Sequence, residues 1–180
     1  MKDLDQILSK AQQNLNETLA DYEAESSTLG QDFQELKLQA SMFQYEICAE
    51  MLGLQRNKPN GFARVIALKG LIHRLYEYDK LLNKHLIRRM LALATSRGIT
   101  VDSKEIKNLR KQWKLELGKL QQWSDIRNET TGHYGHDIAR QVQLLKSISP
   151  AEVMSVTQAF LRFNMGILLV IKNAGAGNGA

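Results

Sequence analysis

Residues 62–97 read FARVIALKGLIHRLYEYDKLLNKHLIRRMLALATSR, a long stretch without proline. Its apolar residues recur at steps of three and four, which is the period of one helix face and not the alternation of a strand. At a rise of 1.5 Å per residue, a helix of this length measures about 50 Å. The stretch therefore predicts one long helix, the spine of a bundle, with an apolar stripe formed by Val65, Leu68, Ile72, Leu75, Leu82, Leu86, Met90 and Leu93.

The helical period continues on both sides of this stretch. Pro59 and Pro150 are the chain's two prolines, and both stand where the helical pattern has stopped. No segment shows the sustained alternation of β-branched residues that is typical of strands. We therefore expect an all-α fold, an antiparallel bundle of about five to six helices. The predicted helices cover residues 2–28, 31–54, 62–97, 103–128, 136–147 and 150–172.

Charge divides the chain into two parts. The whole chain of 180 residues is 43% apolar and 24% charged, which suffices for one domain with a hydrophobic core. Residues 1–55 have three Lys/Arg against ten Asp/Glu, whereas residues 56–180 have 21 against nine. The polar stretch QRNKPNG at 55–61 marks a linker between them. We predict an acidic helical pair over 1–55, a basic helical bundle over 56–172 and a flexible glycine-rich tail over 173–180.

Composition excludes several classes of protein. The single cysteine, Cys48, excludes a disulfide scaffold and fits a reducing compartment. No glycine-rich loop precedes a Lys-Ser/Thr pair, so a P-loop is excluded and we expect no cofactor. The N-terminus lacks the apolar run of a signal peptide, and the run near 159–171 is shorter than the roughly 20 residues of a membrane span. We therefore expect a cytoplasmic protein that has no membrane partner.

The segment that carries chemistry is WSDIRNETTGHYGH, residues 123–136. Arg127 continues the apolar stripe of the 103–128 helix at its last turn, where an unpaired guanidinium is costly to bury. It therefore needs a carboxylate, the last helix carbonyls or a bound anion. His133 follows six residues later, past the helix-breaking Gly132, so a loop can bring both side chains to one place.

An arginine beside a histidine suits metal-free phosphodiester cleavage. The guanidinium fork matches phosphate oxygens, and the imidazole can move the proton of a 2′-hydroxyl or of the leaving oxygen. Asn128 and Tyr134 can add hydrogen bonds to the phosphate or to the imidazole. Alternatively, Arg127 only bonds the last carbonyls of its helix and His133 is an ordinary turn residue.

A metal site is not expected in this segment, because His133 and His136 have only Asp137 nearby as a further ligand. Basic residues instead mark one flank of the 103–128 helix and lead toward Arg127, where we expect an RNA backbone; a solvated helix face is the alternative. Trp113 and Trp123 can stack on bases but fit the core better. The predicted RNA-binding residues are Tyr134, Lys107, Arg110, Lys111 and Lys114, with Lys104 and Lys119 on the same flank.

Arg127-Asn128 followed by His133 resembles the R-x(4–6)-H motif of HEPN domains (higher eukaryotes and prokaryotes nucleotide-binding), where a polar residue often follows the arginine. The resemblance covers about residues 60–172. It implies a HEPN-like helical bundle and a metal-independent endoribonuclease, often a toxin of a toxin–antitoxin pair or an antiviral-defence effector. It also implies a homodimer whose two motifs face each other in one cleft, with an antitoxin or another regulatory protein as a partner.

Carried over residue by residue, the resemblance makes Arg127 the group that binds and stabilises the phosphate, His133 the acid and base, and Asn128 the supporting polar residue. Many HEPN proteins also place a charged residue on an earlier helix, and candidates here are Glu77, Asp79 and Lys80. Some members have lost activity, so two alternatives stay open. One is a catalytically silent HEPN-like module that binds RNA or a nucleotide, and the other is a helical adaptor whose acidic first helices bind a partner protein.

Overall fold

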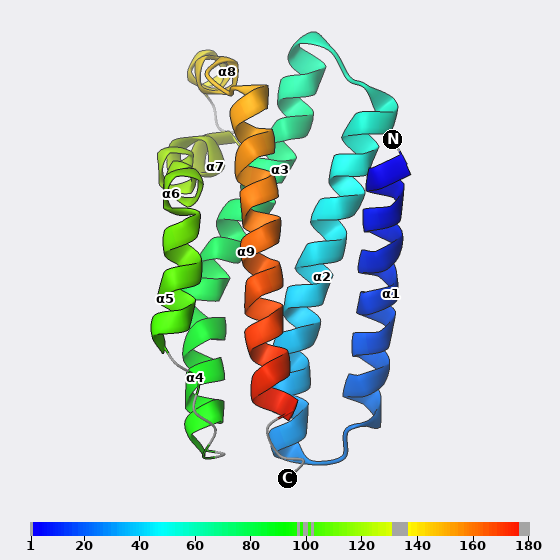
Figure 1. The fold of residues 1–180 in the computed structure, drawn as a ribbon. Coiled ribbons are helices and arrows are strands. Elements are labelled where there is room, and N and C mark those ends of the chain that lie inside the picture. The colour runs from blue at the N-terminus through cyan, green and yellow to red at the C-terminus, as the bar shows by residue number, and fades with distance from the viewer. Residues whose placement is uncertain (1, 97, 99–100, 102, 131–136, 177–180) are drawn as a thin grey trace.

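The computed structural model describes residues 2–96, 98, 101, 103–130 and 137–176, and all regular elements among these residues are helical (Figure 1). The predicted all-α class is therefore confirmed. In chain order the elements are α1 (Lys2–Ala24), α2 (Thr28–Asn57), α3 (Gly61–Leu81), the π-helical turn η1 (Leu82–Leu86), α4 (Ile87–Ser96), α5 (Ser103–Gln112), α6 (Lys114–Gln122), α7 (Ser124–Thr130), α8 (Ile138–Lys146) and α9 (Pro150–Ala176).

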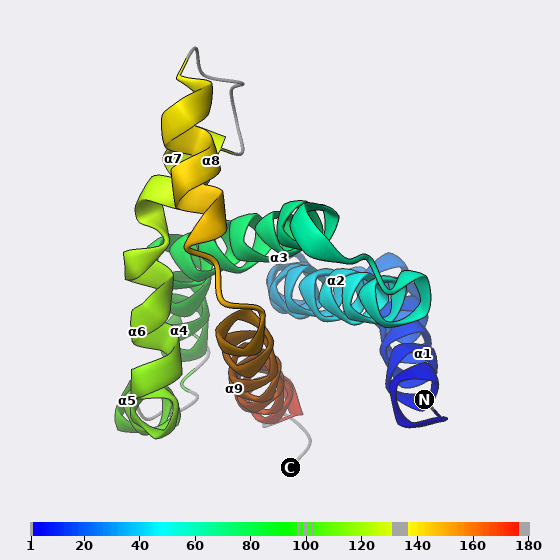
Figure 2. The same cartoon turned by 90° about the horizontal axis from the view of Figure 1, so that it is seen from above.

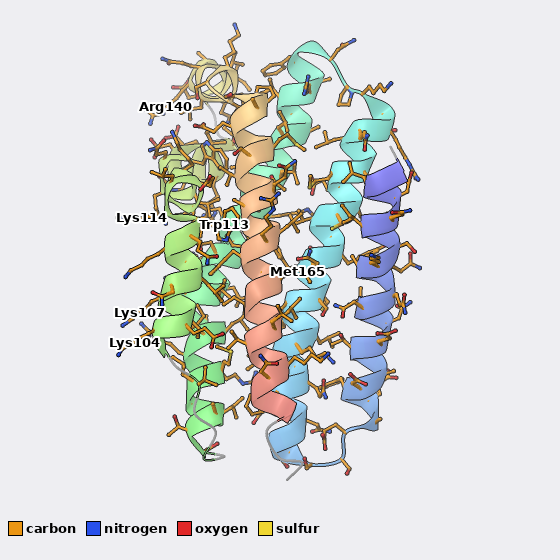
Figure 3. All side chains as sticks on the ribbon, viewed as in Figure 1. Lys104, Lys107, Trp113, Lys114, Arg140 and Met165 are labelled. Atoms are coloured by element: carbon orange, nitrogen blue, oxygen red, sulfur yellow. The ribbon has the colours of Figure 1, made fainter. Side chains whose placement is uncertain are left out.

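Helix α9 is the central rod of the bundle. It packs against α2 and α3 on one side and against α5 and α6 on the other, while α1 packs on α2 (Figure 1). Seen from above, α7 and α8 project away from the bundle beside α3, the first part of the chain's longest rod, α3–η1–α4 (Figure 2). Side chains from these helices fill the interior (Figure 3). One hydrophobic cluster includes Leu36, Leu75 and Phe160, so α2 shares its core with the later helices.

The composition of α9 follows from this central position. Pro150–Asn173 is the one described helix long and apolar enough to cross a membrane, with a mean hydropathy of 1.5. Half of that apolar stretch is buried inside the bundle, and core helices of soluble proteins have the same composition. The apolar character of α9 therefore does not by itself indicate a membrane.

Capping residues place the first helix ends differently from the prediction. Helix α1 ends at Ala24 instead of residue 28, because the Ser27 hydroxyl accepts a hydrogen bond from the Gly30 amide at 3.1 Å and starts α2. Helix α2 continues to Asn57, where Lys58 adopts a left-handed conformation (φ 45°) just before Pro59. At the other end of the chain, α9 runs to Ala176, so the predicted tail over 173–180 begins inside the helix.

Two of the predicted long helices are interrupted. The 62–97 helix contains a π-helical turn at η1, and the 103–128 helix is broken at Trp113 and Trp123 into α5, α6 and α7. Helix α6 packs on α9 and also contacts α3, while α7 packs on α3 and α8. The breaks thus divide the predicted helix into segments with different sets of neighbours.

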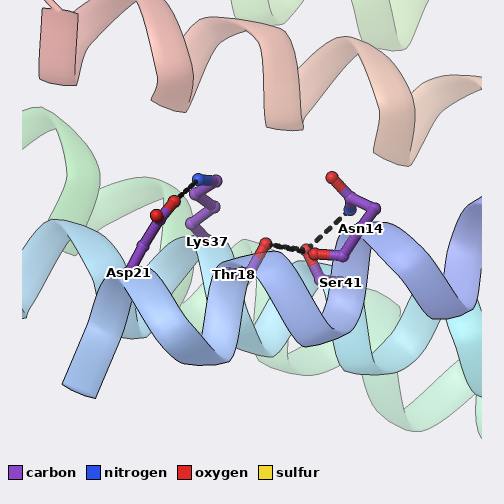
Figure 4. Close-up of polar contacts among 5 residues, drawn as sticks. All are labelled: Asn14, Thr18, Asp21, Lys37 and Ser41. Carbon is purple, nitrogen blue, oxygen red and sulfur yellow. Dashed lines mark hydrogen bonds and ion pairs between the residues drawn. The ribbon is translucent and has the colours of Figure 1, made fainter. Parts of the chain in front are cut away.

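Polar contacts dock α1 on α2, because the apolar stripe of α1 is thin (Figure 4). Asn14 donates from Nδ2 to the Ser41 hydroxyl at 3.1 Å, and the Thr18 hydroxyl lies 3.4 Å from the same Ser41 hydroxyl. Both Thr18 and Ser41 are fully buried. One turn further, Lys37 and Asp21 form an ion pair at 2.6 Å. These contacts define the register of the α1–α2 hairpin.

Asn164 connects three helices in the core. This fully buried side chain on α9 donates from Nδ2 to the Ala40 carbonyl and to Gln44 Oε1 on α2, each at 3.0 Å. Its Oδ1 accepts a hydrogen bond from the Tyr78 hydroxyl on α3 at 2.8 Å. The Tyr78 ring stacks on Phe43 with a centroid separation of 3.8 Å. Both polar atoms of the Asn164 side chain are thereby bonded to protein groups.

Replacing Asn164 tests this arrangement. Asn164→Ala leaves two buried groups, the Tyr78 hydroxyl and Gln44 Oε1, without this partner, so we expect the free energy of unfolding to fall by about 3 kcal/mol. Urea unfolding followed by circular dichroism measures the change. The matched control is Asn173→Ala, at an exposed position on the same helix, which should change stability little. A loss of less than about 1 kcal/mol for Asn164→Ala would contradict the assigned role.

Candidate functional site

Arg127 lies on α7 against α3. Its Nε and Nη2 atoms both lie 2.5 Å from Glu77 Oε1, and its Nη1 donates to Asn128 Oδ1 at 3.0 Å. The guanidinium carbon is 5.9 Å from the centre of the Tyr76 ring. Both charged side chains are about one-third exposed, 31% for Arg127 and 37% for Glu77. The carboxylate that an arginine at this position needs is therefore supplied by Glu77.

The inner face of the last turn of α7 packs on α3 and is hydrogen-bonded to it. Ile126 and Thr130, four residues apart, are both buried. Lys69 of α3 donates from Nζ to the Thr130 carbonyl at 2.8 Å, which satisfies one of the free carbonyls at the helix end. Lys69 therefore takes part in capping this helix end, at the Thr130 carbonyl.

The helix that follows is held beside α7. Arg140 on α8 donates from Nη2 to Glu129 Oε1 at 2.6 Å, and Asp137 caps α8 by accepting from the Arg140 amide at 2.9 Å. These contacts lie on either side of residues 131–136 in the chain. Two predicted site residues, His133 and Tyr134, belong to that connection and lie outside the described residues.

The other two candidates on the earlier helix do not meet Arg127. Asp79 is buried and accepts from Arg110 Nη2 at 3.0 Å, while Asn83 in the π-helical turn accepts from Arg110 Nη1 at 2.8 Å. The same guanidinium lies 5.8 Å from the centre of the Phe163 ring. Lys80 is exposed. Of the three candidates, Glu77 alone contacts Arg127 among the residues that the structure describes.

The predicted RNA-binding lysines gather in one hollow, which we call the basic groove. Lys107, Arg110, Lys111 and Lys114 line this hollow of about 420 Å³, together with Leu117, Gly118 and Gln121. It lies at the break between α5 and α6, and the three lysines are exposed. Lys107 and Lys114 lie along the outer edge of the α5–α6 segment (Figure 3). Arg110 differs from them, because Asp79 and Asn83 hold its guanidinium toward α3 and η1.

A second hollow of about 720 Å³ lies between α2 and α3, and Glu77 and His73 stand in its wall. Arg74 bridges its carboxylates, at 3.0 Å from Glu46 and 2.6 Å from Glu50. Burial raises the pKa of Glu50, while the charge of Arg74 and its hydrogen bond oppose the shift. The predominance of carboxylates makes this hollow unsuitable for phosphate. Sequence reasoning missed it, because its residues come from two helices with no common motif.

Metal ligands do not cluster in the part of the chain that the structure describes: no three His, Cys, Asp or Glu side chains there are arranged to hold an ion. No protein-family model matches the chain, and no curated protein and no solved structure is similar to it. Fold and site together define an all-α protein with an arginine–glutamate pair at the end of α7. The HEPN resemblance stays a prediction.

Cys48 is the chain's one thiol and lies in the core, only 2% exposed. Burial raises its pKa to about 11, so the reactive thiolate is scarce near neutral pH. Burial also raises the pKa of the Tyr78 hydroxyl. Neither group is suited to act as a nucleophile.

These raised pKa values predict a loss of stability in alkali. Between pH 9 and about 11 the Cys48 thiol ionises in the unfolded chain but not in the folded one, so the free energy of unfolding falls as the pH rises. Urea unfolding at pH 8, 9 and 10 should show this decline. Cys48→Ala should make the decline shallower while Tyr78 still contributes. An equally steep decline in Cys48→Ala would show that the thiol does not contribute.

Proposed function

We propose that this chain is a metal-independent endoribonuclease of the HEPN type, acting in the cytoplasm as a homodimer and serving as a toxin or antiviral-defence effector. The observation that carries the proposal is the setting of Arg127. Glu77 and Asn128 orient its guanidinium at the end of α7, directly before the connection that contains His133. A long side chain at a helix end would sample many rotamers if it had no defined partner. Because its partners hold the Arg127 guanidinium in one orientation, that group is suited to catalysis.

Chain length supports a shared site for the arginine and the histidine. Arg127 lies about one helical turn before Thr130, whose carbonyl is anchored to Lys69. His133 follows Thr130 by three residues, which extend over at most about 11 Å. The imidazole thus has a short tether to the arginine, as phosphodiester chemistry at one phosphate requires.

The reaction needs only these groups. The 2′-oxygen attacks phosphorus as its proton passes to a His133 imidazole, the bond from phosphorus to the 5′-oxygen breaks, and the leaving oxygen takes a proton from a second, protonated imidazole. The products are a 2′,3′-cyclic phosphate and a 5′-hydroxyl end. Arg127 stabilises the charge that builds on the non-bridging oxygens, with Asn128 as a hydrogen-bonding neighbour. A homodimer would supply the two imidazoles.

In this scheme Glu77 occupies the phosphate-binding position of Arg127 when no RNA is bound. The ion pair is about one-third exposed on both sides, and such pairs contribute about 1 kcal/mol or less. A phosphate therefore displaces the carboxylate at little cost, while Glu77 orients the guanidinium in the free enzyme. The same pair also favours the second candidate function, a catalytically silent HEPN-like module that binds RNA or a nucleotide, because Glu77 already neutralises the arginine.

The basic groove supports RNA as the ligand. Its exposed lysines provide positive charge for a phosphate backbone, and Gln121 at its far end comes seven residues before Asn128 in the chain. The third alternative, a helical adaptor, rests on the carboxylates of α1 and α2 and predicts no RNA binding. We expect no cofactor and no membrane partner.

Cleavage of RNA in EDTA tests the proposal. We expect purified protein to cut mixed cellular RNA without metal, and Arg127→Ala and His133→Ala each to slow cutting at least about 100-fold. Gel electrophoresis measures the rate, and detection of 2′,3′-cyclic phosphate ends identifies the chemistry. The matched control is His85→Ala, at an exposed histidine on η1, which should cut like the parent.

The outcomes separate the three interpretations. Cutting that persists in both site variants would overturn the assignment of Arg127 and His133. Absence of cutting, with RNA still retained in a gel-shift assay, would favour the silent binding module. Neither cutting nor binding would favour the adaptor.

The salt dependence of RNA binding tests the basic groove separately. Each phosphate contact on single-stranded RNA contributes about 0.7 to the slope of log K against log salt, so Lys111→Gln with Lys114→Gln should reduce the slope by about 1.4. Fluorescence anisotropy from 50 to 300 mM salt measures it. The control removes the same charge at the far end of α2, with Arg56→Gln and Lys58→Gln. Equal slopes in both double variants would show that the groove lysines do not contact RNA and form only a solvated helix face.

A further inference from the structure

A third groove lies on the other side of α9, between α1, α2 and α9. It measures about 470 Å³ and includes Ile7 of α1 together with Met165 and Leu169 of α9. Figure 2 shows α1 and α9 standing on the same side of α2, so that α2 forms the floor of what we call the α1–α9 groove. Three helices thus form three sides of a space that borders solvent.

The groove collects exposed apolar side chains. Ile7 is 41% exposed, Met165 46% and Leu169 57%. Met165 and Leu169 are the large apolar residues that α9 leaves exposed within its described part, and both belong to this groove. Single exposed apolar residues are common, but their convergence from two helices into one hollow marks an interaction surface.

The dimensions fit a fourth helix. The α1 wall runs from Ile7 to Asn14 and the α9 wall from Met165 to Lys172, two helical turns each. Seven residues of helix measure about 10 Å, the length over which an amphipathic helix presents apolar residues at positions i, i+3 or i+4, and i+7. Three packed helices with an open apolar side are a four-helix bundle that lacks one member.

Charge defines the occupant further. Lysines line the groove, and none of its described lining residues is acidic, although residues 1–55 contain ten Asp/Glu. Lys37 is paired with Asp21. Lys10 on α1 and Lys172 on α9 are exposed, and within the described part of the chain neither has an ion-pair partner. An occupant with carboxylates beside its apolar stripe would complement both walls.

We propose that the α1–α9 groove binds an amphipathic helix of a second protein, whose apolar stripe is flanked by Asp or Glu. Leu169 and Met165 contact the stripe, and Lys10 and Lys172 pair with the carboxylates. This interaction is independent of the proposed ribonuclease activity, because the groove and Arg127 lie on different helices.

A pair of synthetic peptides tests the proposal. The probe is a labelled 18-residue helix with leucines at i, i+3, i+4 and i+7 flanked by glutamates, and its counterpart has lysine in place of each glutamate. By fluorescence anisotropy at low salt, we expect the glutamate peptide to bind at least ten times more tightly. Lys10→Glu with Lys172→Glu should invert this preference.

Two matched variants locate the binding. Leu169→Asp should weaken the glutamate peptide at least tenfold, whereas Leu115→Asp, at a leucine on α6 that is 83% exposed, should leave binding unchanged. Circular dichroism verifies that both variants fold, and RNA cleavage should be the same in both.

Several results would overturn the proposal. These are no saturable binding of the glutamate peptide, equal binding of the two peptides, or unchanged binding by Leu169→Asp. If light scattering shows a dimer that dissociates in the Leu169→Asp variant, the occupant of the groove is a second copy of the chain. If the protein cosediments with anionic vesicles and the Leu169→Asp variant does not, the occupant is a lipid surface.

Discussion

The buried amide of Asn164 is the interaction on which the arrangement of helices depends. A fully buried amide is costly unless all its groups are bonded, and here its partners come from two different helices, α2 and α3. Sliding α9 by one turn would leave the Tyr78 hydroxyl and Gln44 Oε1 without this partner in the core. Apolar packing alone would tolerate several registers, so this polar cluster selects one.

The candidate site inherits its geometry from that cluster. Successive residues of a helix point about 100° apart, so once Tyr78 is directed to Asn164, the residues on either side are directed elsewhere. Glu77 then faces α7 and pairs with Arg127, and Asp79 faces α5 and pairs with Arg110. Three consecutive residues of α3 thus contact three different elements, α7, α9 and α5. The arginine–glutamate pair forms because the core contact of Tyr78 sets the rotation of α3.

The sequence predicted what depends on local period and composition, and missed what depends on tertiary contacts. Apolar spacing was sufficient for the all-α class, and the cost of burying a guanidinium was sufficient to require a partner for Arg127. Choosing Glu77 over Asp79 needed the rotation of α3, which Asn164 sets from 86 residues away in the chain. The breaks at Trp113 and Trp123 contain neither glycine nor proline, so no local signal announces them. They separate α6, which packs on α9 and α3, from α7, which packs on α3 and α8.

The two surfaces with distinct chemistry lie on opposite sides of α9. The basic groove belongs to α5 and α6, and the α1–α9 groove to the α1–α2 hairpin and the outer face of α9. A polyanion on one side and an acidic helix on the other would therefore not compete for space. Any influence between them would have to pass through α9, whose register is held by the Asn164 cluster, and a satisfied buried network resists such displacement. The fold therefore favours independent binding at the two grooves, with α9 as a rigid partition between them.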